Sequence, residues 1–146
     1  MKIYLDVCCL NRPFDDQTQD RIHLESEAVL AILKNLDGDN WIWISSSVVL
    51  FEVNQAPNLD RRRRLLKLCE QASSIVKLDE EIFAAAETLK ESGFRSYDAL
   101  HLACARSVGV DVFLSTDDKL IRRAARKKTR VGVRVSNPLT WLQEIL

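Results

Sequence analysis

The sequence is poor in residues that interrupt regular structure. It has only four glycines and three prolines among its 146 residues, and it shows no internal repeat, low-complexity tract or linker. Apolar residues make up 47% of the chain and charged residues 29%, a balance typical of a globular protein and not of a disordered one. The length suits one domain with one core, so we expect a single domain over residues 1–146.

Long hydrophobic runs are also lacking. The longest uncharged stretch, from Asn40 to Phe51, is well short of the ~20 residues that span a bilayer. The first residues, MKIYLD, contain an apolar run that is too short for a signal peptide. We therefore expect a cytoplasmic protein.

The four cysteines do not form a recognisable motif. None belongs to a C-x-x-C pair, and no Cys/His cluster has the spacing of a zinc site. In a reducing compartment we expect free thiols in or near the core, with a disulfide as the less favoured alternative.

Neither sign of charge is in excess, because 21 Lys and Arg balance 21 Asp and Glu. Any affinity for nucleic acid must therefore come from local patches. Two basic runs, at residues 61–64 and 122–130, could contact phosphates. A solvated helix face is the commoner role of such a run.

Short apolar strands alternate with longer helices along the chain. Strands are expected at residues 2–6, 41–45, 74–78, 112–115 and 131–135. Helices are expected at residues 21–36, 47–56, 58–72, 79–93, 96–109 and 118–128, and from Pro138 onward. This alternation predicts an α/β fold with three α/β/α layers around a central, mainly parallel sheet.

Four carboxylates fall on one edge of that sheet. Asp6 ends the first strand, Glu52 lies in the helix after the second, Asp98 lies in the first turn of its helix, and Asp117 follows the fourth strand. Ligands bind at this edge of a parallel sheet, where the strand order reverses. Converging carboxylates repel one another, and Mg²⁺ or Mn²⁺ would relieve that repulsion. Each acid taken alone could instead cap a helix or face solvent.

Other catalytic sets are missing. The chain has no G-x-S-x-G, Walker A or G-x-G-x-x-G motif. A phospho-acceptor receiver domain would need an acidic pair after the first strand, and a haloacid-dehalogenase-type phosphatase would need D-x-D. The segment Asp6-Val7-Cys8 satisfies neither requirement.

The four acids, in order and on these elements, resemble those of the PIN-domain ribonuclease family over nearly the whole chain. The segments that carry the resemblance are IYLD, SSSVVLFEV, YDALHLACA and STDDKL. Each motif is weak alone, but four in order on matching elements are more specific. The run Val7-Cys8-Cys9 departs from the family, many of whose members place a small hydroxyl or amide residue after the first Asp.

The resemblance implies a VapC-like, Mg²⁺- or Mn²⁺-dependent endoribonuclease that cuts single-stranded RNA. Asp6, Glu52, Asp98 and Asp117 would be its catalytic and metal-binding residues. It also implies an antitoxin protein as partner, and we expect a homodimer. The alternative is an inactive PIN scaffold that binds RNA or a protein. Asp118 remains an alternative to Asp117 as the fourth acid.

Three further residues lie near these acids in the sequence. His101 follows Asp98 by three positions, so both share one helical face. We expect a hydrogen-bonded core histidine, with contact to substrate or a carboxylate as the alternative. Ser115 could hydrogen-bond the site or end its strand, and Arg95 could contact a phosphate or form a surface salt bridge.

Overall fold

A five-stranded parallel sheet forms the centre of the fold. The computed structural model describes residues 1–38 and 40–146. The strands are β1 (Lys2–Leu5), β2 (Ile42–Ser46), β3 (Ser74–Val76), β4 (Val112–Leu114) and β5 (Val135–Ser136). Their order is β3-β2-β1-β4-β5, and all four pairings are parallel. This confirms the predicted α/β fold class.

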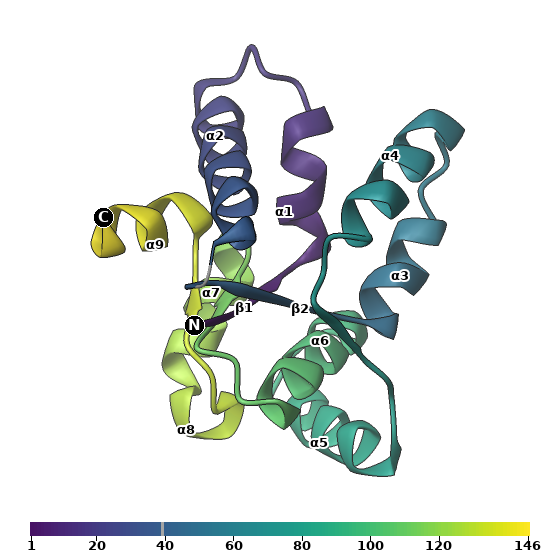
Figure 1. The fold of residues 1–146 in the computed structure, drawn as a ribbon. Coiled ribbons are helices and arrows are strands. Elements are labelled where there is room, and N and C mark those ends of the chain that lie inside the picture. Colours follow the sequence, from purple (N-terminus) through teal and green to yellow (C-terminus); the bar gives the residue numbers. More distant parts are fainter. Residues whose placement is uncertain (39) are drawn as a thin grey trace.

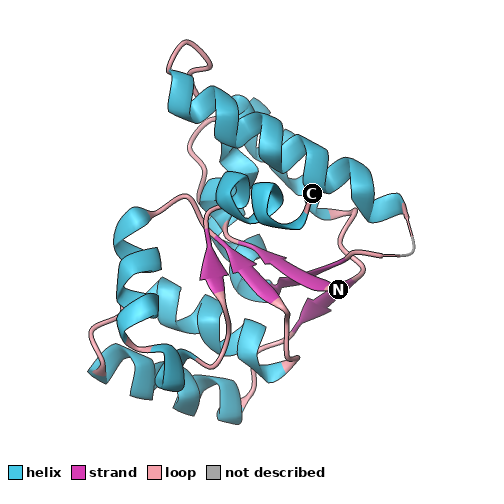
Figure 2. Cartoon of the chain, turned by 90° about the vertical axis from the view of Figure 1, so that its left-hand side faces the viewer, coloured by secondary structure: helices cyan, strands magenta, loops and turns pink. Residues whose placement is uncertain are grey.

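Helices cover both faces of the sheet, as Figure 2 shows. The α-helices are α1 (Val7–Asn11), α2 (Asp20–Lys34), α3 (Ser47–Asn54), α4 (Leu59–Cys69), α5 (Glu80–Glu91), α6 (Ser96–Ser107), α7 (Asp118–Arg126), α8 (Lys128–Val131) and α9 (Pro138–Ile145). Two short 3-10 helices are η1 (Arg12–Phe14) and η2 (Asn35–Asp37). In Figure 1, α1, α2, α4 and α9 lie above the sheet, and α5, α6 and α8 lie below it. None of the helices in the described part of the chain is long and apolar enough to cross a membrane.

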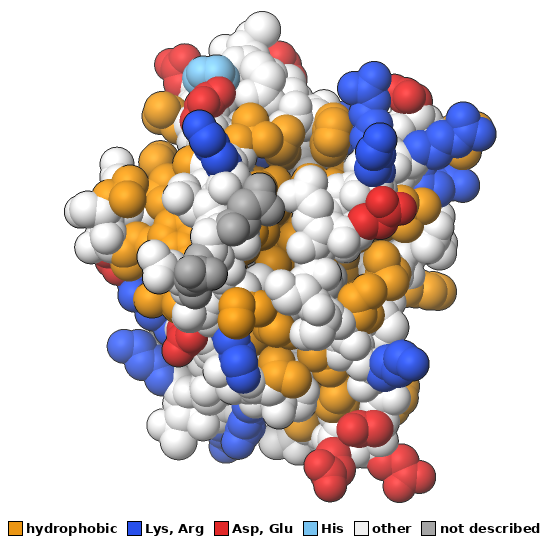
Figure 3. Space-filling model, viewed as in Figure 1, with side chains coloured by type: hydrophobic (Ala, Val, Ile, Leu, Met, Phe, Trp, Pro, Cys, Tyr) orange, Lys and Arg blue, Asp and Glu red, His pale blue; other side chains and the backbone are white. Residues whose placement is uncertain are grey.

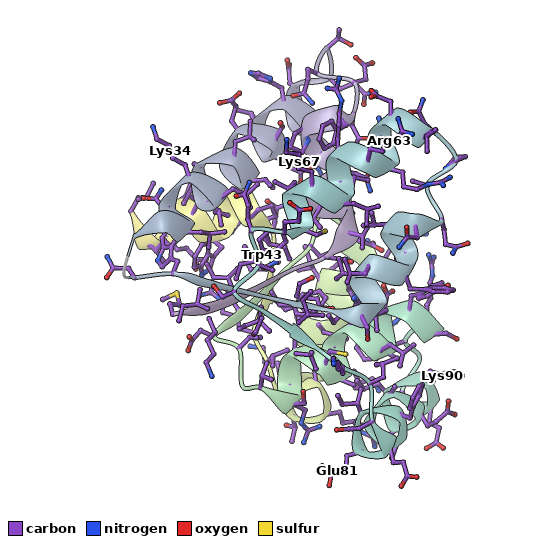
Figure 4. The ribbon with its side chains drawn as sticks, turned by 45° about the vertical axis from the view of Figure 1, so that its right-hand side comes forward. Lys34, Trp43, Arg63, Lys67, Glu81 and Lys90 are labelled. Atoms are coloured by element: carbon purple, nitrogen blue, oxygen red, sulfur yellow. The ribbon has the colours of Figure 1, made fainter. Side chains whose placement is uncertain are left out.

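The core lies on both faces of the central strands. Ile3, Tyr4 and Leu5 of β1 are fully buried, because β1 has a neighbour on each side and helices above and below. Trp43 of β2 is fully buried as well, and Figure 4 shows it inside the molecule. A continuously apolar strand is therefore explained by burial on both faces.

Side-chain caps mark the starts of several helices, close to where the sequence predicted them. Ser46 caps α3 by accepting a hydrogen bond from the Val49 amide, and Asp79 caps α5 in the same way through Ile82. Asn137 caps α9, whose first residue is Pro138. These contacts are local in sequence, which is why a sequence pattern can predict them.

The observed elements differ from the expected ones at two places. Residues 7–14, where no helix was expected, form α1 and η1, and the Asp6 side chain caps α1. The fifth strand spans only Val135–Ser136, since Val131 belongs to α8 and Gly132, with φ of 72°, ends that helix in the left-handed conformation. Ser96 is the first residue of α6, as the expected helix start had it, and Arg95 is the N-cap.

The strand order reverses between β1 and β4. From β1 the chain continues to β2 and β3 on one side, whereas β4 and β5 lie on the other side. The segments that leave the carboxyl ends of β1 and β4 therefore diverge, which opens a crevice at this edge. In Figure 1, β1 leads into α1 and β2 leads into α3.

Candidate functional site

The four carboxylates predicted from the sequence line one cleft at this edge. The cleft has a volume of about 420 Å³. Its walls are formed by Asp6, Val7, Cys8, Asn11, Glu52, Arg95, Ser96, Tyr97, Asp98 and Asp117. The acids come from the ends of β1 and β4 and from helices α3 and α6, so the tertiary fold alone brings them together.

Asp6 is the most enclosed of these acids, with 7% of its surface exposed. Its Oδ1 accepts a hydrogen bond of 2.8 Å from the Val7 amide, and its Oδ2 accepts one of 2.8 Å from the Ser115 hydroxyl. Both contacts hold the carboxylate in one orientation. Ser115 therefore hydrogen-bonds the site, as one reading of the sequence had it.

Cys8 belongs to the run Val7-Cys8-Cys9 that follows Asp6 and departs from the family pattern. Its Sγ lies 3.4 Å from Asp6 Oδ2 and 3.4 Å from Ser115 Oγ. The same sulfur accepts a hydrogen bond of 3.3 Å from the Thr116 amide. The thiol therefore joins the segment after β1 to the segment after β4. All four cysteines are free thiols, as expected.

Asp117 and Asp118 have different surroundings. Asp117 lines the cleft and caps α7, accepting hydrogen bonds from the Lys119 and Leu120 amides. Asp118 instead forms an ion pair with Arg21, with oxygens 2.7 and 2.8 Å from the guanidinium nitrogens. The Arg21 hydrogen bonds lower the pKa of Asp118. The geometry thus favours Asp117 as the acid that faces the cleft.

Asp98 has the most perturbed carboxyl group of the cleft. Its pKa is raised from 3.8 to about 6, first by burial and then by the negative charges of Asp6 and Asp117. His101 and Arg95 oppose this rise without cancelling it. The carboxylates are therefore close enough to repel one another, which is the conflict that a cation would relieve.

Glu52 is held by a buried hydrogen-bonded chain. His101 Nε2 lies 2.5 Å from Glu52 Oε1, and His101 Nδ1 lies 2.6 Å from the Tyr4 hydroxyl. That hydroxyl lies 2.7 Å from Ser46 Oγ. Burial alone would lower the pKa of His101, but the Glu52 hydrogen bond and the charges of Asp6 and Glu52 raise it overall.

His101 is therefore both a buried core residue, as expected, and the partner of a cleft carboxylate. It is 1% exposed. Tyr4 was not singled out from the sequence, where it looked like any residue of an apolar strand. Its hydroxyl gained significance only when α6 packed His101 against β1. No sequence signal would have identified that contact.

The donor set of the cleft fits a hard divalent cation. Carboxylate and water oxygens are the ligands that Mg²⁺ and Mn²⁺ prefer, and Mg²⁺ often takes only one or two carboxylates beside its waters. Within residues 1–38 and 40–146, no group of three or more His, Cys, Asp and Glu side chains stands at direct ligand spacing. The carboxylate oxygens that line the cleft are therefore of the kind that such an ion prefers, and water molecules would complete its ligand set.

A second hollow of about 450 Å³ adjoins the cleft. It shares Val7, Cys8, Asn11 and Glu52 with the cleft, and it also includes Arg12 and Arg61. Arg61 comes from the first basic run and pairs with Asp15 at 3.0 Å. The rest of that run lies on α4, where Figure 4 labels Arg63 beside Lys67, and Figure 3 shows basic side chains gathered over α4. The second run lies on α7 and α8, away from the cleft walls.

Comparison with known proteins agrees with this architecture. The PIN domain family matches residues 3–127. No curated protein matches the sequence. The structure of VapBC-1 from nontypeable Haemophilus influenzae is similar, with a TM-score of 0.60 at 16% identity, covering 94% of this chain and 98% of the other. VapBC2 from Rickettsia felis, bound to a DNA fragment from its promoter, gives a TM-score of 0.58 at 13% identity, with the same coverage. At these identities, the likeness to solved structures establishes the fold.

Proposed function

Because this chain belongs to the PIN domain family, we propose that it is a Mg²⁺- or Mn²⁺-dependent endoribonuclease that hydrolyses single-stranded RNA. The observation that carries the proposal is the convergence of Asp6, Glu52, Asp98 and Asp117 on one cleft. The raised pKa of Asp98 supports it, because the cleft concentrates negative charge that a cation would neutralise. A catalytic set of this kind suits phosphodiester hydrolysis, in which charge develops on oxygen.

Three of the carboxylates would hold the cation. Asp6 is oriented by Val7 and Ser115, Asp117 is oriented by the first turn of α7, and Asp98 lies in the first turn of α6. When bound, the ion would polarise a phosphoryl oxygen, help to ionise the attacking water and stabilise the leaving oxygen. The protein supplies the rigid positions of the ligands, because each of the three sits where a strand ends or a helix begins.

Glu52 would serve as a ligand or orient the attacking water. One of its oxygens is engaged by His101, which leaves the carboxylate fixed at the wall of the cleft. A carboxylate held in this way can accept a proton from water within hydrogen-bond reach. His101 is not in contact with the cleft surface and would act through Glu52.

The likeness to VapBC proteins supports a toxin role with an antitoxin protein as partner. The adjoining hollow could hold a part of the RNA that extends beyond the carboxylates. Arg12 and Arg61 line this hollow and would offer cationic groups to the phosphates of the RNA. The alternative is a scaffold that binds RNA or a partner without cutting. Turnover by purified protein separates the two functions.

The test is cleavage of a labelled panel of single-stranded RNAs with Mg²⁺ or Mn²⁺, with and without EDTA. Asp6→Asn and Asp98→Asn keep the side-chain shape and remove its charge, so each should slow cleavage on the order of a thousandfold. Asp118→Asn is the matched control, because Asp118 pairs with Arg21 outside the cleft, and it should cut nearly as fast as wild type.

End-group analysis tests the chemistry itself. Attack by water on phosphorus breaks the bond to the 3′-oxygen, which leaves and takes up a proton, so the products carry a 5′-phosphate and a 3′-hydroxyl. Products with a 2′,3′-cyclic phosphate would exclude this mechanism. Equal cleavage by wild type and both Asn variants would mean that the activity is a contaminant or lies at another site.

A further inference from the structure

Two exposed aromatic side chains meet beside the carboxylate cleft. Phe51 of α3 is 55% exposed and Tyr97 of α6 is 44% exposed. Their ring centroids are 6.2 Å apart and their planes are inclined by 34°. The two rings come from helices far apart in the sequence, so their pairing is a product of the fold.

The position of the pair links it to the candidate active site. Phe51 precedes Glu52 in the chain, and Tyr97 precedes Asp98. Tyr97 also lines the carboxylate cleft, together with Arg95. Arg95 is exposed. Its positive charge acts on Asp98 and opposes the rise in the pKa of that carboxyl group. The lining of the cleft therefore combines four acids with the cationic Arg95 and the Tyr97 ring, and Tyr97 in turn contacts the exposed ring of Phe51.

Helix packing does not account for the exposure of these rings. The neighbours Val48, Val49 and Val53 turn the apolar face of α3 inward, whereas Phe51 points out of it. Single exposed apolar residues are common and need no explanation. Two rings in contact at the rim of a polar cleft are a more specific arrangement, and Figure 3 shows apolar side chains exposed over α3.

We propose that Phe51 and Tyr97 form a stacking platform for an unpaired base of the RNA strand, and that Arg95 contacts a phosphate beside it. This inference rests on the proposed function and names how the strand is bound. Every base has a flat face that can stack on an aromatic ring, so the platform accepts any sequence. Bases in a duplex already stack on each other, so it selects single strands.

An RNA strand is favoured over a protein partner because the pair is continuous with a cleft whose acids suit phosphodiester chemistry. A cationic group beside aromatic rings is also the combination that single-stranded nucleic acids require. A protein partner would explain the exposed rings but not their position at the carboxylates. Binding of a protein partner at these rings is therefore the alternative outcome of the test.

The test compares two strands that differ only in their bases. One is a short fluorescent RNA, and the other is a strand of equal length built from stable abasic ribose units. Binding is measured by fluorescence anisotropy in EDTA, so that no strand is cut. Wild type should bind the RNA about 5- to 100-fold more tightly than the abasic strand, as expected for stacking of a base.

The variants separate stacking from charge. Phe51→Leu and Tyr97→Leu keep apolar bulk but lose the rings, so they should bind the two strands with nearly equal affinity. Tyr97→Phe retains the ring and should bind both strands as wild type does.

Arg95→Gln should lower the affinity for both strands alike and flatten the salt dependence of binding. Phe83→Leu is the matched control, since Phe83 is 50% exposed on α5 and does not line the cleft. Melting temperatures would verify that each variant is folded.

Two failures are distinguishable. If wild type binds neither strand and cuts no RNA, the proposed function fails and the platform fails with it. If wild type cuts RNA but both Leu variants prefer the RNA strand over the abasic strand as wild type does, the platform alone is overturned. Contact with a protein partner would then be the explanation for the exposed pair of rings.

Discussion

His101 Nε2 lies 2.5 Å from Glu52 Oε1, and this contact joins a fully buried tyrosine to a carboxylate of the cleft. Tyr4 fixes the opposite edge of the imidazole at 2.6 Å. The ring is therefore held from both nitrogens, and it holds Glu52 in turn. A histidine held in this way would orient the Glu52 carboxylate, as the outer partners of metal ligands do.

Replacement of His101 should therefore reduce activity without a direct contact to substrate. We expect His101→Leu to lower the cleavage rate about 10- to 100-fold, the usual cost of losing such a partner. His101→Gln retains a donor for Glu52 and should recover part of the rate. His23→Gln is the control, because His23 is exposed on α2. The measurement is the cleavage rate of folded His101→Leu relative to that of folded His101→Gln. Equal losses of rate in the two variants would indicate that His101 has a merely structural role.

The two neighbouring acids after β4 should differ in their response to metal. A cation that binds only the native state stabilises it by about 2.7 kcal/mol at a hundredfold excess over Kd. Mg²⁺ or Mn²⁺ should raise the melting temperature of wild type and Asp118→Asn, and raise it less in Asp6→Asn and Asp117→Asn. Asp6 and Asp117 are helix N-caps, and Asn is as good an N-cap as Asp, so the fold should survive both of these changes. The same shift in all four proteins would place the metal elsewhere.

Asp98 should make the metal-free protein less stable as pH rises. Its pKa in the folded state is about 6, against an ordinary 3.8, so the folded state holds the proton more tightly than the unfolded state. The free energy of unfolding therefore falls as pH rises from about 4 to about 6. Thermal melting in EDTA should show Asp98→Asn to be more stable than wild type at pH 8.

The pH series requires a comparison between variants, because other groups titrate as well. His101 has a raised pKa, so its contribution is also lost as pH rises through that value. The difference between Asp98→Asn and wild type isolates Asp98. Asp60→Asn, an exposed acid paired with Arg64, should give no such difference. A wild-type advantage at pH 8 would contradict the repulsion inferred for the cleft.

We expect the protein to form a homodimer through helical surfaces. Leu24 and Leu30 of α2 are 51% and 45% exposed, and burial of such side chains would favour association. Light scattering should give the mass of two chains at micromolar concentration, and Leu24→Gln with Leu30→Gln should shift it towards one. A monomeric mass for wild type across that range would refute the prediction.

Local patterns in the sequence determined much of this protein. The alternation of short apolar runs and helical periods predicted the parallel sheet and both helix layers, because such periods report which face of an element is buried. The predicted helix starts near residues 79 and 138 match local caps, because Asp79 and Asn137 each accept a hydrogen bond from an amide two or three residues away. The placement of Asp6 and Asp117 at strand ends followed from the same local reading.

Contacts between distant segments were decided only by the tertiary structure. The strand order places β1 beside β4, which brings Ser115 to Asp6 across 109 positions of sequence. The ion pair of Asp118 with Arg21 distinguishes it from Asp117, although the two are adjacent in sequence. No periodicity encodes which side chain will lie opposite another, because that depends on how whole helices pack. The sequence could therefore name the four acids, while the packing of α3 and α6 supplied the His101 contact and the aromatic pair beside them.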